Sequence, residues 1–146
     1  MKVSTVAFSL DNITSLVAVA RDHDGKILQH SIAFTTELDT HLVNASSLLI
    51  GFQLASKWNF SYCILETEDN IVLNHVCNSS RLWDAYLART FESIFCEAGH
   101  ILSWIVILVD RSINGLAWDL AFWACMYLLE EDWFIPLVLW HFYLCT

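Results

Sequence analysis

Apolar and polar residues alternate at the start of the chain. Residues 2–9 and 13–20 are rich in β-branched side chains at roughly every second position, which is typical of strands with one buried face. After them, Asp24 and Gly25 provide a turn whose glycine accepts a positive φ, and the strand pattern resumes over residues 27–34. The pattern therefore predicts a three-stranded antiparallel meander.

The hydrophobic period then changes to that of a helix. Apolar residues recur at helical spacing over residues 40–57, and Asp39 or Thr40 stands where an N-cap is needed. Further along, the pattern predicts a short buried strand over residues 60–66 and a short helix with an acidic first turn over 68–77. An amphipathic helix over 81–97, a central strand over 101–109 and a closing helix over about 112–128 follow.

The elements follow one another in the order β-β-β-α-β-α-α-β-α. Strands joined by turns pair antiparallel, and strands joined through helices pair parallel. We therefore predict an α/β fold with a five-stranded mixed sheet, three antiparallel strands and then two parallel ones, flanked by helices. A length of 146 residues fits one domain, which we place at residues 1–126, followed by an apolar extension at 127–146 that packs on the domain or faces a partner.

Composition and charge narrow the possible classes of protein. Apolar residues make up 56% of the chain and charged residues 16%, so we expect an ordered domain with much apolar surface and a tendency to self-associate. Asp110, Arg111 and Asp119 interrupt the most apolar region, which argues against a membrane span. The start of the chain lacks the apolar core of a signal peptide, so we expect an intracellular protein, in the cytoplasm or the nucleus.

The net charge is −9, which argues against a general nucleic-acid binder, because such proteins carry a basic face. The five cysteines are widely spaced and form no Cys-x-x-Cys pair, so we expect buried free thiols. The six histidines show no zinc-binding spacing.

Three stretches nevertheless resemble a known family, in its order and at its spacing: VAVARDHDGKIL, LVNASSLLIGFQLASKWNFSYCILETED and VDRSINGLAWDLAFWA. Together they are similar to the ribonuclease H type 1 domain, and most closely to the reverse-transcriptase-like ribonuclease H domains of plants. The resemblance covers roughly residues 1–126. It implies a ribonuclease H-like fold that cuts the RNA strand of RNA–DNA hybrids with two magnesium ions held by four acidic residues, because clustered carboxylates hold such cations.

The resemblance places the four family acids on Val6, Asn44, Glu68 and Trp118. Only Glu68 is acidic, so it is the one metal-ligand candidate, and Glu66 or Asp69 is the neighbouring acid that could assist it. We therefore expect a catalytically degenerate domain with no cofactor, in which Mg²⁺ would act only if some family activity were left. Asp119 does not replace the acid at Trp118, because one helical residue turns the side chain by about 100°.

Three functional hypotheses stay open. The first is a degenerate ribonuclease H-like domain with weak contact to RNA or to RNA–DNA hybrids, for which the few candidate cations are Lys57, Arg81, Arg89 and Arg111. The second is a protein-interaction module or decaying paralogue that associates through Trp118, Phe122, Trp123 and the segment from Trp133 to Trp140. The third is an active ribonuclease with a shifted set of acids: Asp11, Glu66, Glu68 and Asp69.

Overall fold

The computed structural model describes residues 1–59, 61–78 and 85–130. Five strands and four helices are placed there, in the order that the hydrophobic pattern predicts: β1 (Lys2–Leu10), β2 (Ile13–Arg21), β3 (Ile27–Thr35), α1 (Thr40–Trp58), β4 (Tyr62–Thr67), α2 (Asn70–Cys77), α3 (Ala85–Ala98), β5 (Ser103–Leu108) and α4 (Gly115–Glu130).

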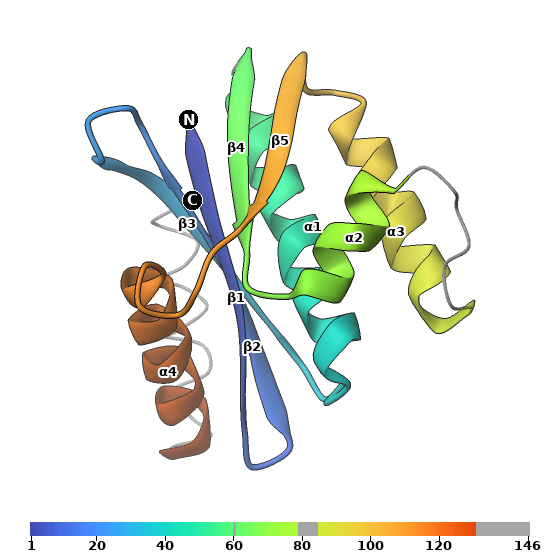
Figure 1. Ribbon diagram of the computed structural model, residues 1–146. Helices are drawn as coiled ribbons and strands as arrows, with labels where there is room; N and C mark the ends of the chain where they lie inside the picture. The colour runs from blue at the N-terminus through green and yellow to red at the C-terminus, as the bar shows by residue number, and fades with distance from the viewer. Residues whose placement is uncertain (60, 79–84, 131–146) are drawn as a thin grey trace.

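The five strands form one mixed sheet in the order β3-β2-β1-β4-β5 (Figure 1). β1 pairs with β2, and β2 with β3, in antiparallel register, whereas β4 runs parallel to both β1 and β5. The predicted fold class, three antiparallel strands followed by two parallel ones, is confirmed. Because β1, β4 and β5 run the same way, their carboxyl ends come together at one edge of the sheet.

Polar side chains fix the turns and the first helix. Gly25 has φ +81°, and the carboxylate of Asp22 accepts the backbone N–H groups of Asp24 and Lys26, which closes the β2–β3 turn. The carboxylate of Asp39 accepts the backbone N–H of Leu42 at the start of α1. Of the two N-cap residues that the sequence allowed, Asp39 is therefore the one used.

Helices cover both faces of the sheet (Figure 1). α1 lies against β1 so closely that a Cβ atom on Gly51 would come within 2.7 Å of the Thr5 Cγ2 atom, and the main core fills the space between the sheet, α1 and α3. α4 lies on the opposite face, where Ala117 and Ala121 pack on Val6 and Val17. Small alanine side chains let this helix approach the strands closely.

α4 continues to Glu130, past the boundary at residue 126 that we expected between the domain and an extension. The tail from Trp133 to Trp140 lies outside the described residues. Within the part that the structure describes, no helix is both long and apolar enough to cross a membrane.

The cysteines depart from the expectation of buried thiols. Cys63 and Cys125 are buried, but Cys77 and Cys96 are exposed, and all four are free. Cys77 ends α2, and Cys96 lies on the outer side of α3, so spacing along the chain could not distinguish the two kinds. Burial raises the pKa of the Cys63 thiol to about 11.

Candidate functional site

The position of the first family acid lies on the sheet face that α4 covers. Val6 is only 2% exposed and packs with Val17 and Val19 of β2 and with Ala117 and Ala121 of α4. Ser4 is opposite Glu66 in the parallel pairing of β1 with β4, so Val6 and Glu68 continue the same two rows toward the carboxyl ends of the strands. The sequence thus places an apolar side chain where a metal ligand is expected.

Glu68, the one acid among the four positions that the resemblance assigns, accepts two hydrogen bonds. Its Oε2 atom receives the indole N–H of Trp118 at 2.5 Å and the amide N–H of Asn114 at 2.7 Å. The Asn114 amide also donates to the Thr5 carbonyl oxygen at 3.0 Å and is 2% exposed. Two N–H donors therefore occupy Oε2, one of the two oxygens of this carboxylate.

The indole of Trp118 lies between an aromatic ring and a cation. Phe8 meets it edge-on, with ring centroids 5.6 Å apart, and the guanidinium carbon of Arg111 lies 4.1 Å from its ring centroid. Arg111 also lines an open cleft of about 520 Å³ together with Glu68, Leu108, Val109 and Asp110. A cation–π contact of this kind holds the guanidinium at the mouth of the cleft.

Asn44 is joined to a different carboxylate. Its amide donates to Asp69 Oδ2 at 3.3 Å, and the Nδ1 atom of His41 lies 2.8 Å from the same oxygen. The other oxygen, Asp69 Oδ1, accepts the backbone N–H groups of Ile71 and Val72 as the N-cap of α2. The hydrogen bond to Asp69 raises the pKa of His41, although partial burial opposes the change.

The shifted set of acids is not brought together. Asp11 is in the turn after β1, five residues beyond Val6, which corresponds to about 16 Å along a strand. Glu66 is buried and has an ion contact with Lys2, 3.4 Å from Nζ to Oε1. Asp69 is the cap of α2. Among the described residues, no group of three or more His, Cys, Asp or Glu side chains is placed to hold a metal ion.

The four family positions do not fit two magnesium ions as they stand. Magnesium takes oxygen ligands and favours carboxylates, but Val6 offers no ligand and Trp118 presents an N–H donor. Asn44 directs its amide N–H toward Asp69, and Glu68 already accepts two donors. Asp119 is exposed, as expected for a side chain turned away from the position of Trp118.

The candidate cations do not form one surface. Lys57 is near the end of α1, at the edge where β4 begins, whereas Arg111 follows the end of β5. These edges are separated by the length of a strand, about 20 Å. Arg89 is on α3, on the face of the sheet opposite α4 (Figure 1), and Arg81 lies outside the described residues. Of the candidate cations that the structure describes, only Arg111 therefore lies beside Glu68.

Comparisons with known proteins identify the family and the fold of this chain. The family model described as reverse transcriptase-like matches residues 4–124. The chain belongs to the reverse transcriptase-like family. The match takes in Val6, Asn44, Glu68 and Trp118, so all four positions fall within the part of the chain that defines this family. No protein of curated function matches the chain.

Solved structures show the same fold for this reverse transcriptase-like chain. Ribonuclease H1 from the archaeon Halobacterium salinarum has a TM-score of 0.71 and 18% identity, covering 82% of this chain and 92% of that one. The N-terminal ribonuclease H domain of a Mycobacterium tuberculosis protein scores 0.72 at 18% identity, covering 82% and 90%. LC11 ribonuclease H1 from compost, solved with an RNA/DNA hybrid, scores 0.72 at 13%, covering 82% and 91%. The ribonuclease H fold is therefore confirmed.

Two features of this reverse transcriptase-like site were not predicted from the sequence. Asn114 lies in the third matching stretch and was given no role, although its buried amide donates a hydrogen bond to Glu68. His41 and Asp69 were also left unconnected, although they meet across 28 positions of sequence. The spacing of Asn114 before Trp118 was a usable signal for the first feature, and nothing local indicated the second.

Proposed function

We propose that this chain is a ribonuclease H-like domain that contacts nucleic acid without cutting it by two-metal chemistry. The observation that carries the proposal is the occupied carboxylate of Glu68, which accepts the indole N–H of Trp118 and the amide N–H of Asn114 on a single oxygen. Two-metal hydrolysis needs ions that stabilise both the attacking and the leaving oxygens, and one engaged carboxylate does not hold such a pair.

The replacements also suit a fold without metal. Four carboxylates in one cluster repel one another unless cations neutralise them, whereas Val6 adds apolar contacts and Trp118 supplies a donor to the remaining acid. Melting temperature should therefore be nearly independent of magnesium. A rise of several degrees on adding millimolar Mg²⁺ would contradict this part of the proposal.

Arg111 supports the retained contact with nucleic acid. Its guanidinium is stacked on Trp118 and lines the open cleft beside Glu68, and a guanidinium is well suited to phosphate oxygens. The positive charge lies in the cleft beside Glu68, the acid that the resemblance assigns to the metal site. With Asp110 and Glu68 in the same cleft and a net charge of −9, binding should be weak and strongly dependent on salt.

The cleavage part is tested with a labelled RNA–DNA hybrid and Mg²⁺ or Mn²⁺. The parent chain should cut no faster than its Glu68→Ala variant, which controls for contaminating nuclease. A variant that carries Val6→Asp, Asn44→Glu and Trp118→Asp restores the four acids and should gain metal-dependent stabilisation, and cleavage where it folds well. Parent activity that Glu68→Ala abolishes would sink the proposal and favour the active-enzyme hypothesis.

The binding part is tested by fluorescence anisotropy of the same hybrid in EDTA. Arg111→Gln should weaken binding and reduce the slope of log K against log salt by about 0.7–0.9, the value for one phosphate contact. Arg89→Gln makes the same change of charge on the opposite face and is the matched control. Equal binding by both variants would remove Arg111 from the proposal.

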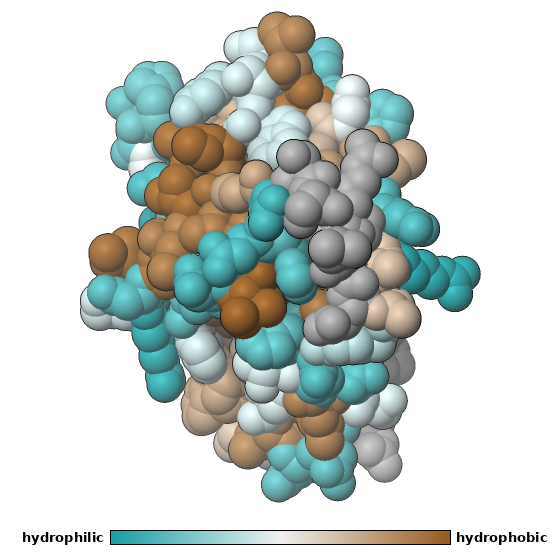
Figure 2. Space-filling model, turned by 45° about the vertical axis from the view of Figure 1, so that its right-hand side comes forward, coloured by the Kyte–Doolittle hydropathy of each residue, from teal (hydrophilic) through white to brown (hydrophobic). Residues whose placement is uncertain are grey.

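A second function, a protein-interaction module, is favoured by the exposed apolar surface. Figure 2 shows brown, apolar side chains gathered on one side of the molecule. Large exposed apolar residues lie on β5 and in the segments just before and after it, namely Leu102, Ile105, Leu108 and Ile113, which are 86%, 45%, 48% and 63% exposed. Association through such side chains does not weaken with salt, in contrast to phosphate contacts. Light scattering at low and high salt therefore distinguishes the two functions.

A further inference from the structure

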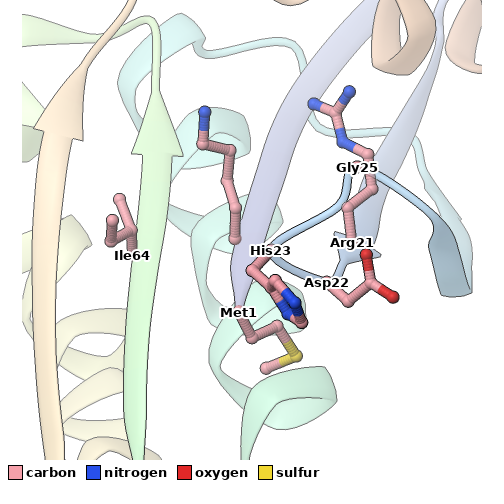
Figure 3. A pocket seen from close by; sticks show the side chains of 7 residues that line it. Met1, Arg21, Asp22, His23, Gly25 and Ile64 are labelled. Carbon is pink, nitrogen blue, oxygen red and sulfur yellow. The ribbon is translucent and has the colours of Figure 1, made fainter.

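A second cavity lies at the opposite edge of the sheet, where β1 and β4 begin. Its volume is about 290 Å³, and its lining comes from the start of β1, the end of β2 with the turn that follows, and Ile64 of β4. Figure 3 shows Arg21, Asp22 and His23 on one side of this cavity, Met1 beside them and Ile64 across from them. The family acid positions lie toward the other ends of the same strands.

Two cations meet at this cavity because of strand register. Lys2 of β1 is paired with Arg21 of β2 on one side and with Ile64 of β4 on the other, so the two basic side chains project from the same face of the sheet. Both line the cavity. Their proximity is unusual for a chain in which acids outnumber Lys and Arg by 16 to 7.

These cations have donors to spare. A guanidinium carries five N–H donors; the Nη2 atom of Arg21 donates to Ser4 Oγ at 2.9 Å, and its Nε atom, although buried, has no partner among the described residues. The ammonium of Lys2 lies 3.4 Å from Glu66 Oε1, its one described ion contact, and the side chain is 47% exposed. Because Nε is buried, a ligand with several acceptor oxygens would meet the Nη groups of Arg21 and the ammonium of Lys2.

Two acids lie near the cavity. Asp22 lines it and directs Oδ1 to the backbone N–H groups of Asp24 and Lys26, both at 2.9 Å. Glu66 is a buried carboxylate whose Oε1 atom lies 3.4 Å from Lys2 Nζ, and its oxygens accept no hydrogen bond among the described residues. His23, whose side chain is 87% exposed, lies 3.4 Å from Asp24 Oδ2. The lining therefore carries two cations, Lys2 and Arg21, one acid, Asp22, and the apolar side chains of Ile64 and Met1.

We propose that this cavity binds a phosphate group, either the free ion or a phosphomonoester. Arg21 would grip two oxygens in the bidentate manner of a guanidinium, and Lys2 would act as a point charge on a third. The apolar wall at Ile64 leaves room for the group that carries the phosphate. This site is separate from the Glu68 cleft, and the proposal does not rest on nucleic-acid binding there.

The test is a titration of the ¹⁵N-labelled full chain with inorganic phosphate, followed by amide chemical shifts, with chloride added to hold ionic strength constant. We expect saturable shifts confined to residues 21–26 and 62–64, with a dissociation constant on the order of millimolar. Arg21→Gln should weaken binding at least tenfold, and Arg89→Gln, the matched loss of charge on α3, should leave it unchanged. Shifts scattered over the surface, or equal affinity in Arg21→Gln, would overturn the proposal.

Two further arms complete the test. Because Arg21 bonds Ser4, its replacement can disturb the fold, so Lys2→Gln serves as a second variant and must also weaken binding in a chain whose amide spectrum is intact. A 5′-phosphorylated dinucleotide that binds more tightly than inorganic phosphate would identify an ester as the occupant, and equal affinity would identify the free ion. Acetate that binds as tightly as phosphate would refute a phosphate site.

Discussion

The hydrogen bond between Trp118 and Glu68 provides the sharpest test of how α4 is attached to the sheet. Trp118→Phe removes the indole N–H but keeps an aromatic ring between Phe8 and Arg111. The Asn114 donor to Glu68 stays in place at 2.7 Å. The substitution thus removes one donor from a carboxylate that still has another.

The size of the effect follows from the 2.5 Å distance and the charge on Glu68. Hydrogen bonds to charged groups contribute about 1.5–3 kcal/mol to stability, and this pair is only partly buried, so we expect about 1.5 kcal/mol for the bond itself. For a chain of 146 residues, that corresponds to a fall in melting temperature of about 5 °C. The smaller ring adds a packing loss that the bond does not explain.

A double-mutant cycle separates the bond from the packing loss. The free energy of unfolding is measured by urea denaturation for the parent, Trp118→Phe, Glu68→Ala and the double variant, and circular dichroism is the probe because a tryptophan is removed. We expect a coupling energy of about 1.5 kcal/mol between the two sites. Trp123→Phe changes another tryptophan of α4 and measures the generic cost of the smaller ring.

A coupling energy within about 0.3 kcal/mol of zero, the usual error of additivity, would refute this reasoning. It would mean that water stabilises the Glu68 carboxylate as effectively as the Trp118 indole does. An unfolding free energy that rises in Trp118→Phe would be a stronger contradiction, because it would show the indole to be strained against the acid rather than bonded to it.

Three other predictions follow from the fold. The hydrogen bond to Asp69 raises the pKa of His41. The stability that this contact adds is therefore present below about pH 6.5 and is lost as pH rises through the raised pKa. The urea midpoints of the parent and of His41→Gln should converge at high pH, and a difference between them that does not change with pH would contradict this. Gly51→Ala should destabilise the chain by about 1–3 kcal/mol because α1 has no room for a Cβ atom, whereas Gly115→Ala, with open space around it, should be nearly neutral in the same denaturation series. Cys63, whose thiol pKa is about 11, should resist a thiol reagent at pH 8 in the folded chain; rapid loss of this thiol by mass spectrometry would show that it is accessible.

The fold was largely predictable because its signals are local. Alternation identified β1 to β3, and the change of period identified α1 with its cap at Asp39. The connections then fixed which strands are parallel. Boundaries moved by a few residues at Tyr62, Ser103 and Gly115, because strands and helices end where hydrogen bonding ends and apolar runs continue past that point.

The site was only partly predictable because its contacts are distant in sequence. The family resemblance assigned four positions, which all lie within the matched segment, but hydrogen bonds between residues 46 and 50 positions apart decide what Glu68 contacts. The same limit applies to the cavity at Arg21, which depends on the register of three strands. The sequence indicated an acid at Glu68. Only the packing of α4 on the sheet showed that its carboxylate accepts hydrogen bonds from Asn114 and Trp118.

The bonding of Glu68 also affects how retained acids are interpreted in related sequences. Its carboxylate joins the end of β4 to the first turns of α4, through Asn114 and Trp118. Selection for a firmly seated helix would preserve an acid here even in a chain without the catalytic chemistry. In an alignment, an acid at this position would therefore count as a sign of activity only when the tryptophan is absent.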